Sequence, residues 1–217
     1  MSFFSNFQSD KCPGPVTGNP MAGLTEKVCI QAEKVFDACI KQNQLENYAL
    51  TLSDFTPADP AFPLTFISAR SSCSKGQVEN LNIDRQPDKQ CARVSCNVVI
   101  PMQVVYVDAA GKEGTAQASI TVSADVLLFV PAPSIMPYNV TAIVSAVAPE
   151  GTFVSQGGTF NVNCCVTVIL KVSMPVELLI PTYGYCAIPP AQEYSHEVCT
   201  GFFELPLYPQ GNKHCCK

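Results

Sequence analysis

The residues of this 217-residue chain with the widest chemical range are its 12 cysteines and 2 histidines. These side chains bind zinc, form disulfides, or serve as a nucleophile with its base. A structural zinc site takes four such ligands, usually as two closely spaced pairs. The nearest approximations are Cys91-x₄-Cys96, His196-x₂-Cys199 and His214-Cys215-Cys216. Because none of them is a C-x₂-C pair, we expect neither a metal ion nor another cofactor.

Thiol catalysis needs a cysteine, a histidine base and a group that orients the base. His196 and Cys199 are close enough in sequence to suggest such a pair, but a surface histidine near a structural cysteine is the strongly favoured interpretation. The chain has no G-x-S-x-G, P-loop or H-E-x-x-H motif. We therefore expect a protein that is not an enzyme.

Disulfide formation is the chemistry that remains once metal binding and catalysis are disfavoured. The cysteines are dispersed along the whole chain, which also favours disulfides. A buried thiol is usually inert, so cysteines in regular segments are interpreted as core or intrachain residues: Cys29, Cys39, Cys91, Cys96 and Cys164. Cysteines in the tails, and one that faces outward, are the candidates for cross-links to other chains: Cys12, Cys165, Cys215 and Cys216. The pairing itself stays open.

The adjacent pair Cys164-Cys165 lies in the stretch from Gly158 to Cys186, around which the chain is organised. Successive strand residues point to opposite faces, so the two thiols are expected on opposite faces. Cys164 shares its face with Val166 and Val168, and Cys165 shares its face with Thr167. The pattern predicts a long strand, a break at Pro175, and a second strand.

Regularly spaced apolar segments with proline and glycine between them predict strands from Tyr48 onward, including a hairpin with its tip at Ala109–Lys112. Before them, Leu24 to Glu46 has apolar residues near helical spacing. The predicted fold is mainly β, an antiparallel β-sandwich with one N-terminal α-helix and extended N- and C-terminal arms.

Four segments follow from this interpretation. Residues 1–22 form a flexible arm, 23–46 a helix packed on the β domain, 47–187 the β-sandwich, and 188–217 an extended tail that contains cysteines. The arm has three apolar rings, Phe3, Phe4 and Phe7, which make it a candidate for assembly contacts.

Composition narrows the class of protein further. Hydrophobic residues make up 47% of the chain and charged residues only 14%, which favours association. The net charge of -5 argues against nucleic acid, and the apolar runs are too short to insert into a membrane. The first residues lack the pattern of a signal peptide. Since many cysteines indicate an oxidising destination, we expect synthesis in the cytoplasm and oxidation later.

Several stretches resemble known proteins of bacterial spores. NVVIPMQVVYVDAAG (97–111) and ADVLLFVP (124–131), with the long strand after Gly158, resemble the β-sandwich domain of spore coat proteins. KVCIQAEKVFDACIKQ (27–42) and the segment from Tyr183 to Gln210 are similar to cysteine-rich exosporium and coat proteins of anaerobic spore formers. The resemblance implies a structural protein whose final location is the spore surface.

Two functions are compatible with these features. The first is a self-assembling, disulfide-cross-linked structural protein of a spore surface layer or appendage, either a sheet or a filament. Its partners would be copies of itself and other spore-surface proteins. The alternative is a surface-attached ligand-binding β-sandwich module without catalytic activity, which the absence of tryptophan disfavours.

Overall fold

The computed structural model describes residues 18–85, 91–155, 158–186 and 188, and within these ranges the protein is all-β. The strands are β1 (Glu26–Thr51), β2 (Ser53–Thr56), β3 (Thr65–Ser71), β4 (Lys75–Asp84), β5 (Cys91–Val107), β6 (Glu113–Phe129), β7 (Asn139–Ser155) and β8 (Thr159–Thr182). The registered strand pairs are antiparallel. None of the described ranges contains a helix long and apolar enough to cross a membrane.

The prediction of a helix between Leu24 and Glu46 is wrong, because β1 occupies this segment. Along β1 the half-buried positions alternate with exposed ones from Val28 to Ala32, and the pattern is then broken by three exposed residues, 33–35, and by Phe36 and Asp37, which are both half-buried. Because of this break, the apolar residues of the segment recur along the sequence at intervals close to those of a helix. The segment is a strand because β8 offers it a long partner, and pairing of this kind overrides a weak local preference for helix.

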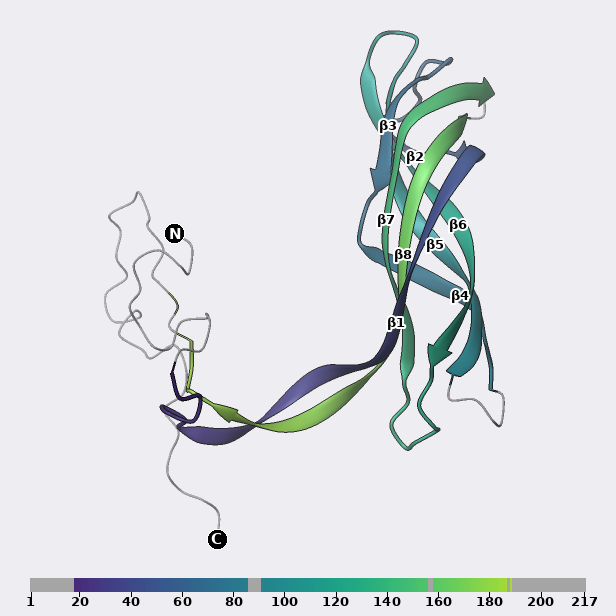
Figure 1. Ribbon diagram of the computed structural model, residues 1–217. Coiled ribbons are helices and arrows are strands. Elements are labelled where there is room, and N and C mark those ends of the chain that lie inside the picture. Colours follow the sequence, from purple (N-terminus) through teal and green to yellow (C-terminus); the bar gives the residue numbers. More distant parts are fainter. Residues whose placement is uncertain (1–17, 86–90, 156–157, 187, 189–217) are drawn as a thin grey trace, which may run out of the picture. The chain divides into compact units, whose positions relative to one another are not determined.

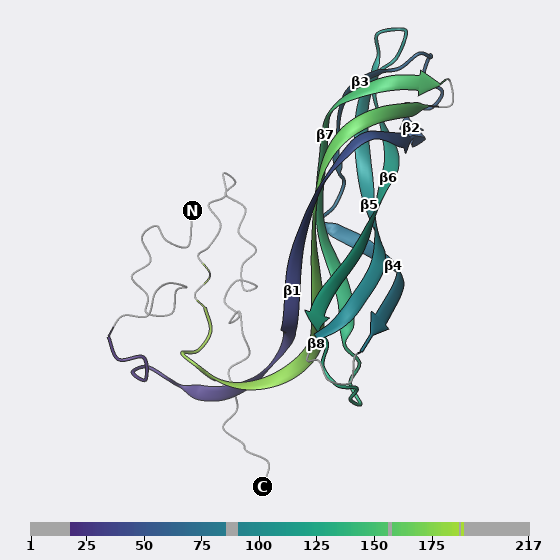
Figure 2. The same ribbon diagram turned by 45° about the vertical axis from the view of Figure 1, so that its right-hand side comes forward.

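The strands form one eight-stranded sheet in the order β1-β8-β7-β3-β5-β6-β2, with β4 pairing with β5 and β7. The two end strands, β1 and β2, are separated in sequence only by Leu52, whose N–H donates to the Gly158 carbonyl at 2.9 Å. The sheet must therefore curve back on itself so that one continuous segment reaches both of its ends. The predicted sandwich of two sheets is thus replaced by a single curved sheet around one core (Figures 1 and 2).

The core is built from alternate residues of the long strands. In β5, Val94, Val98 and Ile100 are fully buried while their neighbours along the strand are not. β5 pairs with β6 through a ladder that runs from Cys91–Phe129 to Val107–Glu113. The predicted hairpin tip between these strands is confirmed, since the N–H of Asp108 donates to the Lys112 carbonyl at 2.9 Å.

β8 continues through Pro175, so the expected break at this residue is wrong. The ladder between β7 and β8 has its last rung on this side at Asn139–Ser173. Beyond Ser173, β8 lacks its β7 neighbour, and a strand with a neighbour on one side tolerates a proline without a backbone N–H.

The chain divides into two compact units, one of residues 32–176 and one of residues 1–31 with 177–217. In the second unit, the N–H and hydroxyl of Thr25 both donate to the Thr182 carbonyl, at 3.0 and 3.2 Å. The hydroxyl of Tyr183 donates to the Pro20 carbonyl. The described part of this unit is therefore held together by strand pairing and by contacts of the adjoining turn.

Candidate assembly surface and its thiols

The outer face of the β7–β8 ladder is unusually apolar for a sheet face that is open to solvent. Three successive rungs of its outward residues are Ile143–Ile169, Ser145–Thr167 and Val147–Cys165. Ile143 is 39% exposed and Val147 is 52% exposed, although both lie in the middle of a long strand. An antiparallel sheet normally carries polar residues on its solvated face, so this face has the composition of a contact surface.

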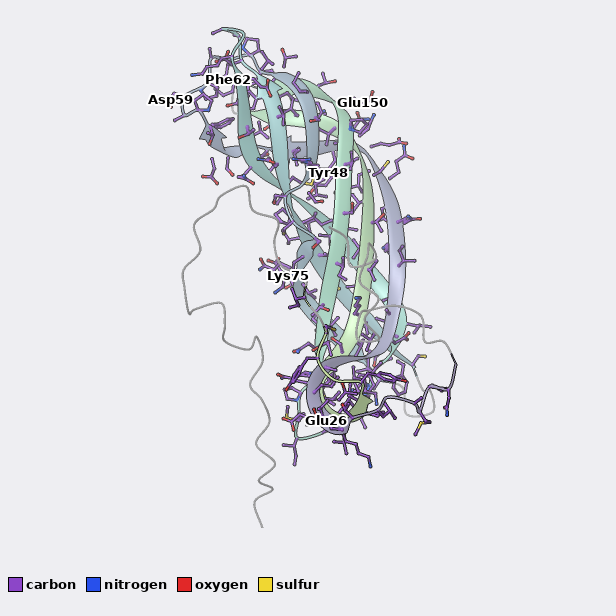
Figure 3. The ribbon with its side chains drawn as sticks, turned by 90° about the vertical axis from the view of Figure 1, so that its left-hand side faces the viewer. Glu26, Tyr48, Asp59, Phe62, Lys75 and Glu150 are labelled. Carbon is purple, nitrogen blue, oxygen red and sulfur yellow. The ribbon has the colours of Figure 1, made fainter. Side chains whose placement is uncertain are left out.

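One charged residue lies at each end of this apolar region, and the two charges have opposite signs. At one end Glu150 pairs with Asn163, whose amide Nδ2 donates to Glu150 Oε1 at 2.8 Å. At the other end Thr141 pairs with Lys171. Figure 3 labels Glu150 toward one end of the sheet. We call the whole set the outer stripe: Thr141, Ile143, Ser145, Val147, Glu150, Asn163, Cys165, Thr167, Ile169 and Lys171.

Cys164 and Cys165 lie on opposite sides of β8. Cys164 is 1% exposed and belongs to the core, whereas Cys165 is exposed within the outer stripe. Burial, and then the neighbouring Cys165, raises the pKa of the Cys164 thiol to about 11. Since the thiolate is the reactive species, Cys164 is chemically inert at neutral pH while Cys165 is open to reagents and partners.

A second group of thiols lies inside the unit formed by residues 32–176. Cys96 of β5 is buried, and Cys39 of β1 is half-buried against the same core. Burial raises the pKa of Cys96, and the proximity of Cys39 raises it further while Lys41 opposes the shift. Burial likewise raises the pKa of Cys39, against a backbone hydrogen bond with Leu170. Both thiols are therefore held in their protonated form, as expected of residues that pack rather than react.

The remaining described cysteines are exposed. Cys29 and Cys91, which the sequence assigns to the core or to intrachain bonds, are both open to solvent, so burial does not explain them. Cys73 and Cys186 are also exposed and were missed as candidates. Cys73 follows two serines in the turn between β3 and β4, and this polar setting was the available sign that the thiol would be accessible.

The other predicted site residues lie outside the described ranges. These are the tail cysteines Cys12, Cys215 and Cys216 and the three phenylalanines Phe3, Phe4 and Phe7. Their roles in cross-linking and assembly stay predictions. Within the described ranges, no group of three or more cysteine, histidine or acidic side chains is arranged to hold a metal ion.

An open hollow lies in the unit that contains residues 18–31 and 177–186. Its walls are mostly apolar and come from Met21, Leu24, Thr25, Glu26, Lys27, Leu179 and Pro181. Met21 and Leu179 are 70% and 68% exposed, so the hollow is a shallow apolar surface. Its polar lining comes from the consecutive residues Thr25, Glu26 and Lys27.

Comparison with known proteins adds one relative. Over 61 residues the chain is 41% identical to exosporium protein A of Clostridium sporogenes (strain ATCC 15579), a match that covers 25% of this chain and 20% of that protein. Part of the chain is related to an exosporium protein. No family model matches the chain, and no solved structure matches it. The relation and the β-rich fold are compatible with a structural role at the spore surface.

Proposed function

We propose that this protein is a self-assembling structural protein of a bacterial spore surface layer or appendage, in which disulfides cross-link neighbouring copies. The observation that carries the proposal is the exposed apolar sheet face of β7 and β8, together with exposed thiols elsewhere on the molecule. An apolar surface associates with another surface, and thiols outside the contact can then make the association covalent. Cys29, Cys73 and Cys91 are accessible thiols of this kind, on other strands and turns.

The relation to exosporium protein A supports the location. A spore surface is exposed to air and to the surrounding medium once the mother cell lyses. There, two thiols from different copies would lose two protons and two electrons to dioxygen and form one disulfide. The order of events is then synthesis in a reducing compartment, non-covalent association, and oxidation in place.

Electrophoresis of purified protein tests the covalent part of the proposal. The protein is incubated in air at increasing concentration and boiled in detergent with and without a thiol reductant. We expect a ladder of oligomers without reductant and monomer with it, since detergent and heat break non-covalent contacts but leave disulfides intact. An aliquot alkylated before exposure to air serves as the control and should remain monomeric. Clean monomer in every lane would refute disulfide cross-linking.

Electron microscopy tests assembly separately from cross-linking. Concentrated protein kept under reductant should form sheets or filaments that dissociate on dilution, and oxidised protein should form assemblies that persist. Protein that stays monomeric by light scattering at every concentration, in both redox states, would overturn the structural role.

A further inference from the structure

We propose that the outer stripe is an isologous interface, in which the β7–β8 face of one copy packs against the same face of a second copy with its strands running in the opposite direction. The two-fold axis lies at the Ser145–Thr167 rung. This inference rests on the proposed self-assembly and names the surface, the partner and the register.

The register follows from the order of rungs along the ladder. About an axis at Ser145–Thr167, the apolar rung Val147–Cys165 of one copy lies over the apolar rung Ile143–Ile169 of the other. The next rungs outward also exchange, so that Glu150–Asn163, which follows a bulge in β7 between Val147 and Glu150, lies over Thr141–Lys171. A single rotation therefore brings apolar residues onto apolar residues and a carboxylate next to an ammonium group, twice in each dimer. Self-complementarity of this kind is what a two-fold interface requires.

The sizes of the side chains suit this arrangement. Ser145 and Thr167 are small, so the two sheets can approach at the axis to the spacing of about 10 Å that is usual for sheets packed face to face. Val147 and Ile143 then lose their contact with water. The exposed thiol of Cys165 lies against the aliphatic side chain of Ile169 of the second copy, and not against the other copy's thiol.

The charges on the neighbouring strands predict a like-charge contact at the rim of the same interface, which can be tested separately. Arg70 of β3 pairs with Val147, and Lys75 of β4 pairs with Ile143, so both cations flank the outer stripe on the same side of β7. Figure 3 labels Lys75. The two-fold rotation that brings Glu150 of one copy next to Lys171 of the other also places Arg70 of one copy over Lys75 of the other. Both are exposed and lie at the rim, where solvent and salt screen the repulsion.

Charge exchange in the full-length chain tests the register. Dimerisation is measured by sedimentation equilibrium in a phosphine reductant, which keeps disulfides from forming. Glu150→Lys and Lys171→Glu should each weaken the dimer about tenfold, because each single change places like charges together twice per dimer. The double variant should recover the wild-type affinity to within about threefold, and Lys75→Glu should strengthen the dimer by pairing with Arg70 of the second copy. Lys112→Glu, at the exposed hairpin tip, is the matched control and should change nothing.

Chemical cross-linking locates the axis. Thr167→Cys in a Cys165→Ser background, treated with a short bismaleimide, should give a peptide in which residue 167 of one copy is linked to residue 167 of the other. Absence of this link, or a double variant no tighter than the singles, overturns the proposed interface.

The result separates this inference from the proposed function. A protein that is monomeric under reductant but cross-links in air refutes the outer-stripe dimer and leaves disulfide assembly standing. A protein that dimerises through the stripe but never cross-links refutes the covalent assembly alone.

Discussion

The carboxylate of Asp37 accepts a hydrogen bond from the backbone N–H of Phe129 at 2.7 Å, and it thereby joins β1 to β6, two strands that are not neighbours in the sheet. Two further side chains of β1 act in the same way. Lys41 donates to the Ser123 carbonyl at 2.8 Å, and the Tyr48 hydroxyl accepts from the Thr121 N–H at 3.1 Å. Side chains thus connect the curved sheet where a main-chain ladder between these strands is missing.

Replacing Asp37 with alanine should destabilise the protein by about 1.5–3 kcal/mol, the usual contribution of a hydrogen bond to a charged group. The free energy of unfolding is measured by urea denaturation, with the slope checked for constancy. Glu33→Ala, which removes an exposed carboxylate from the same strand, is the control and should change stability by less than about 0.5 kcal/mol. Equal stability of the two variants would show that the Asp37 contact does not hold the strands together.

Gly76 is a second point where strands approach closely. A methyl group added there would lie 2.6 Å from Val144 Cγ1 and 2.8 Å from Val98 Cγ1, and both valines are buried. We expect Gly76→Ala to destabilise the protein by about 1–3 kcal/mol through overpacking. Adding Val144→Ala makes room for the new methyl group, so the double variant should be more stable than the sum of the two single changes predicts. Strict additivity would contradict the clash.

The two thiols of the adjacent pair should differ in reactivity. At pH 8, a small alkylating reagent should modify Cys165 and spare Cys164, because Cys164 is buried and its pKa is raised to about 11. Peptide mass spectrometry after quenching gives the extent at each position. In denaturant, both cysteines should react at similar rates. This control would show that the difference in the folded protein comes from burial and not from the neighbouring residues in the sequence.

The same raised pKa links stability to pH. The folded state holds the Cys164 proton more tightly than the unfolded state, whose thiol has an ordinary pKa of 9.0. Stability from this group is therefore complete below about pH 9 and is lost as the pH rises toward about 11. Urea midpoints at pH 8 and pH 10.5 should fall less in a Cys164→Ala variant than in the wild type. An equal fall in both proteins would assign the alkaline loss of stability to other groups.

The tail cysteines remain the predicted cross-linking residues of the C-terminus. Lys213, His214 and Lys217 surround Cys215 and Cys216, and nearby positive charge favours the reactive thiolate. Changing both cysteines to serine should lower the yield of cross-linked oligomers while leaving the urea midpoint unchanged. Detection of both thiols in the free state in assembled wild-type protein, by mass spectrometry of an unreduced digest, would exclude them as cross-links.

Much of the β structure follows from local pattern alone. In β8, apolar residues alternate with polar ones from Phe160 onward, and an alternating strand with one buried face can take only one orientation. The hairpin between β5 and β6 follows in the same way from a glycine-containing turn between two alternating segments. These features depend on residues that are close together in the chain, so they can be predicted without knowledge of the fold.

Segments whose patterns are ambiguous take their structure from contacts with distant parts of the chain. The segment from Leu24 to Glu46 has spacing compatible with a helix, and only the long partner strand β8 makes it a strand. Pro175 would end an isolated strand, yet β8 passes through it where one neighbour is missing. The outer stripe likewise cannot be recognised in the sequence, because it forms only when the register places Val147 beside Cys165 and Ile143 beside Ile169. Pairing partners and register are set by contacts between residues far apart in the chain, and local sequence does not encode them.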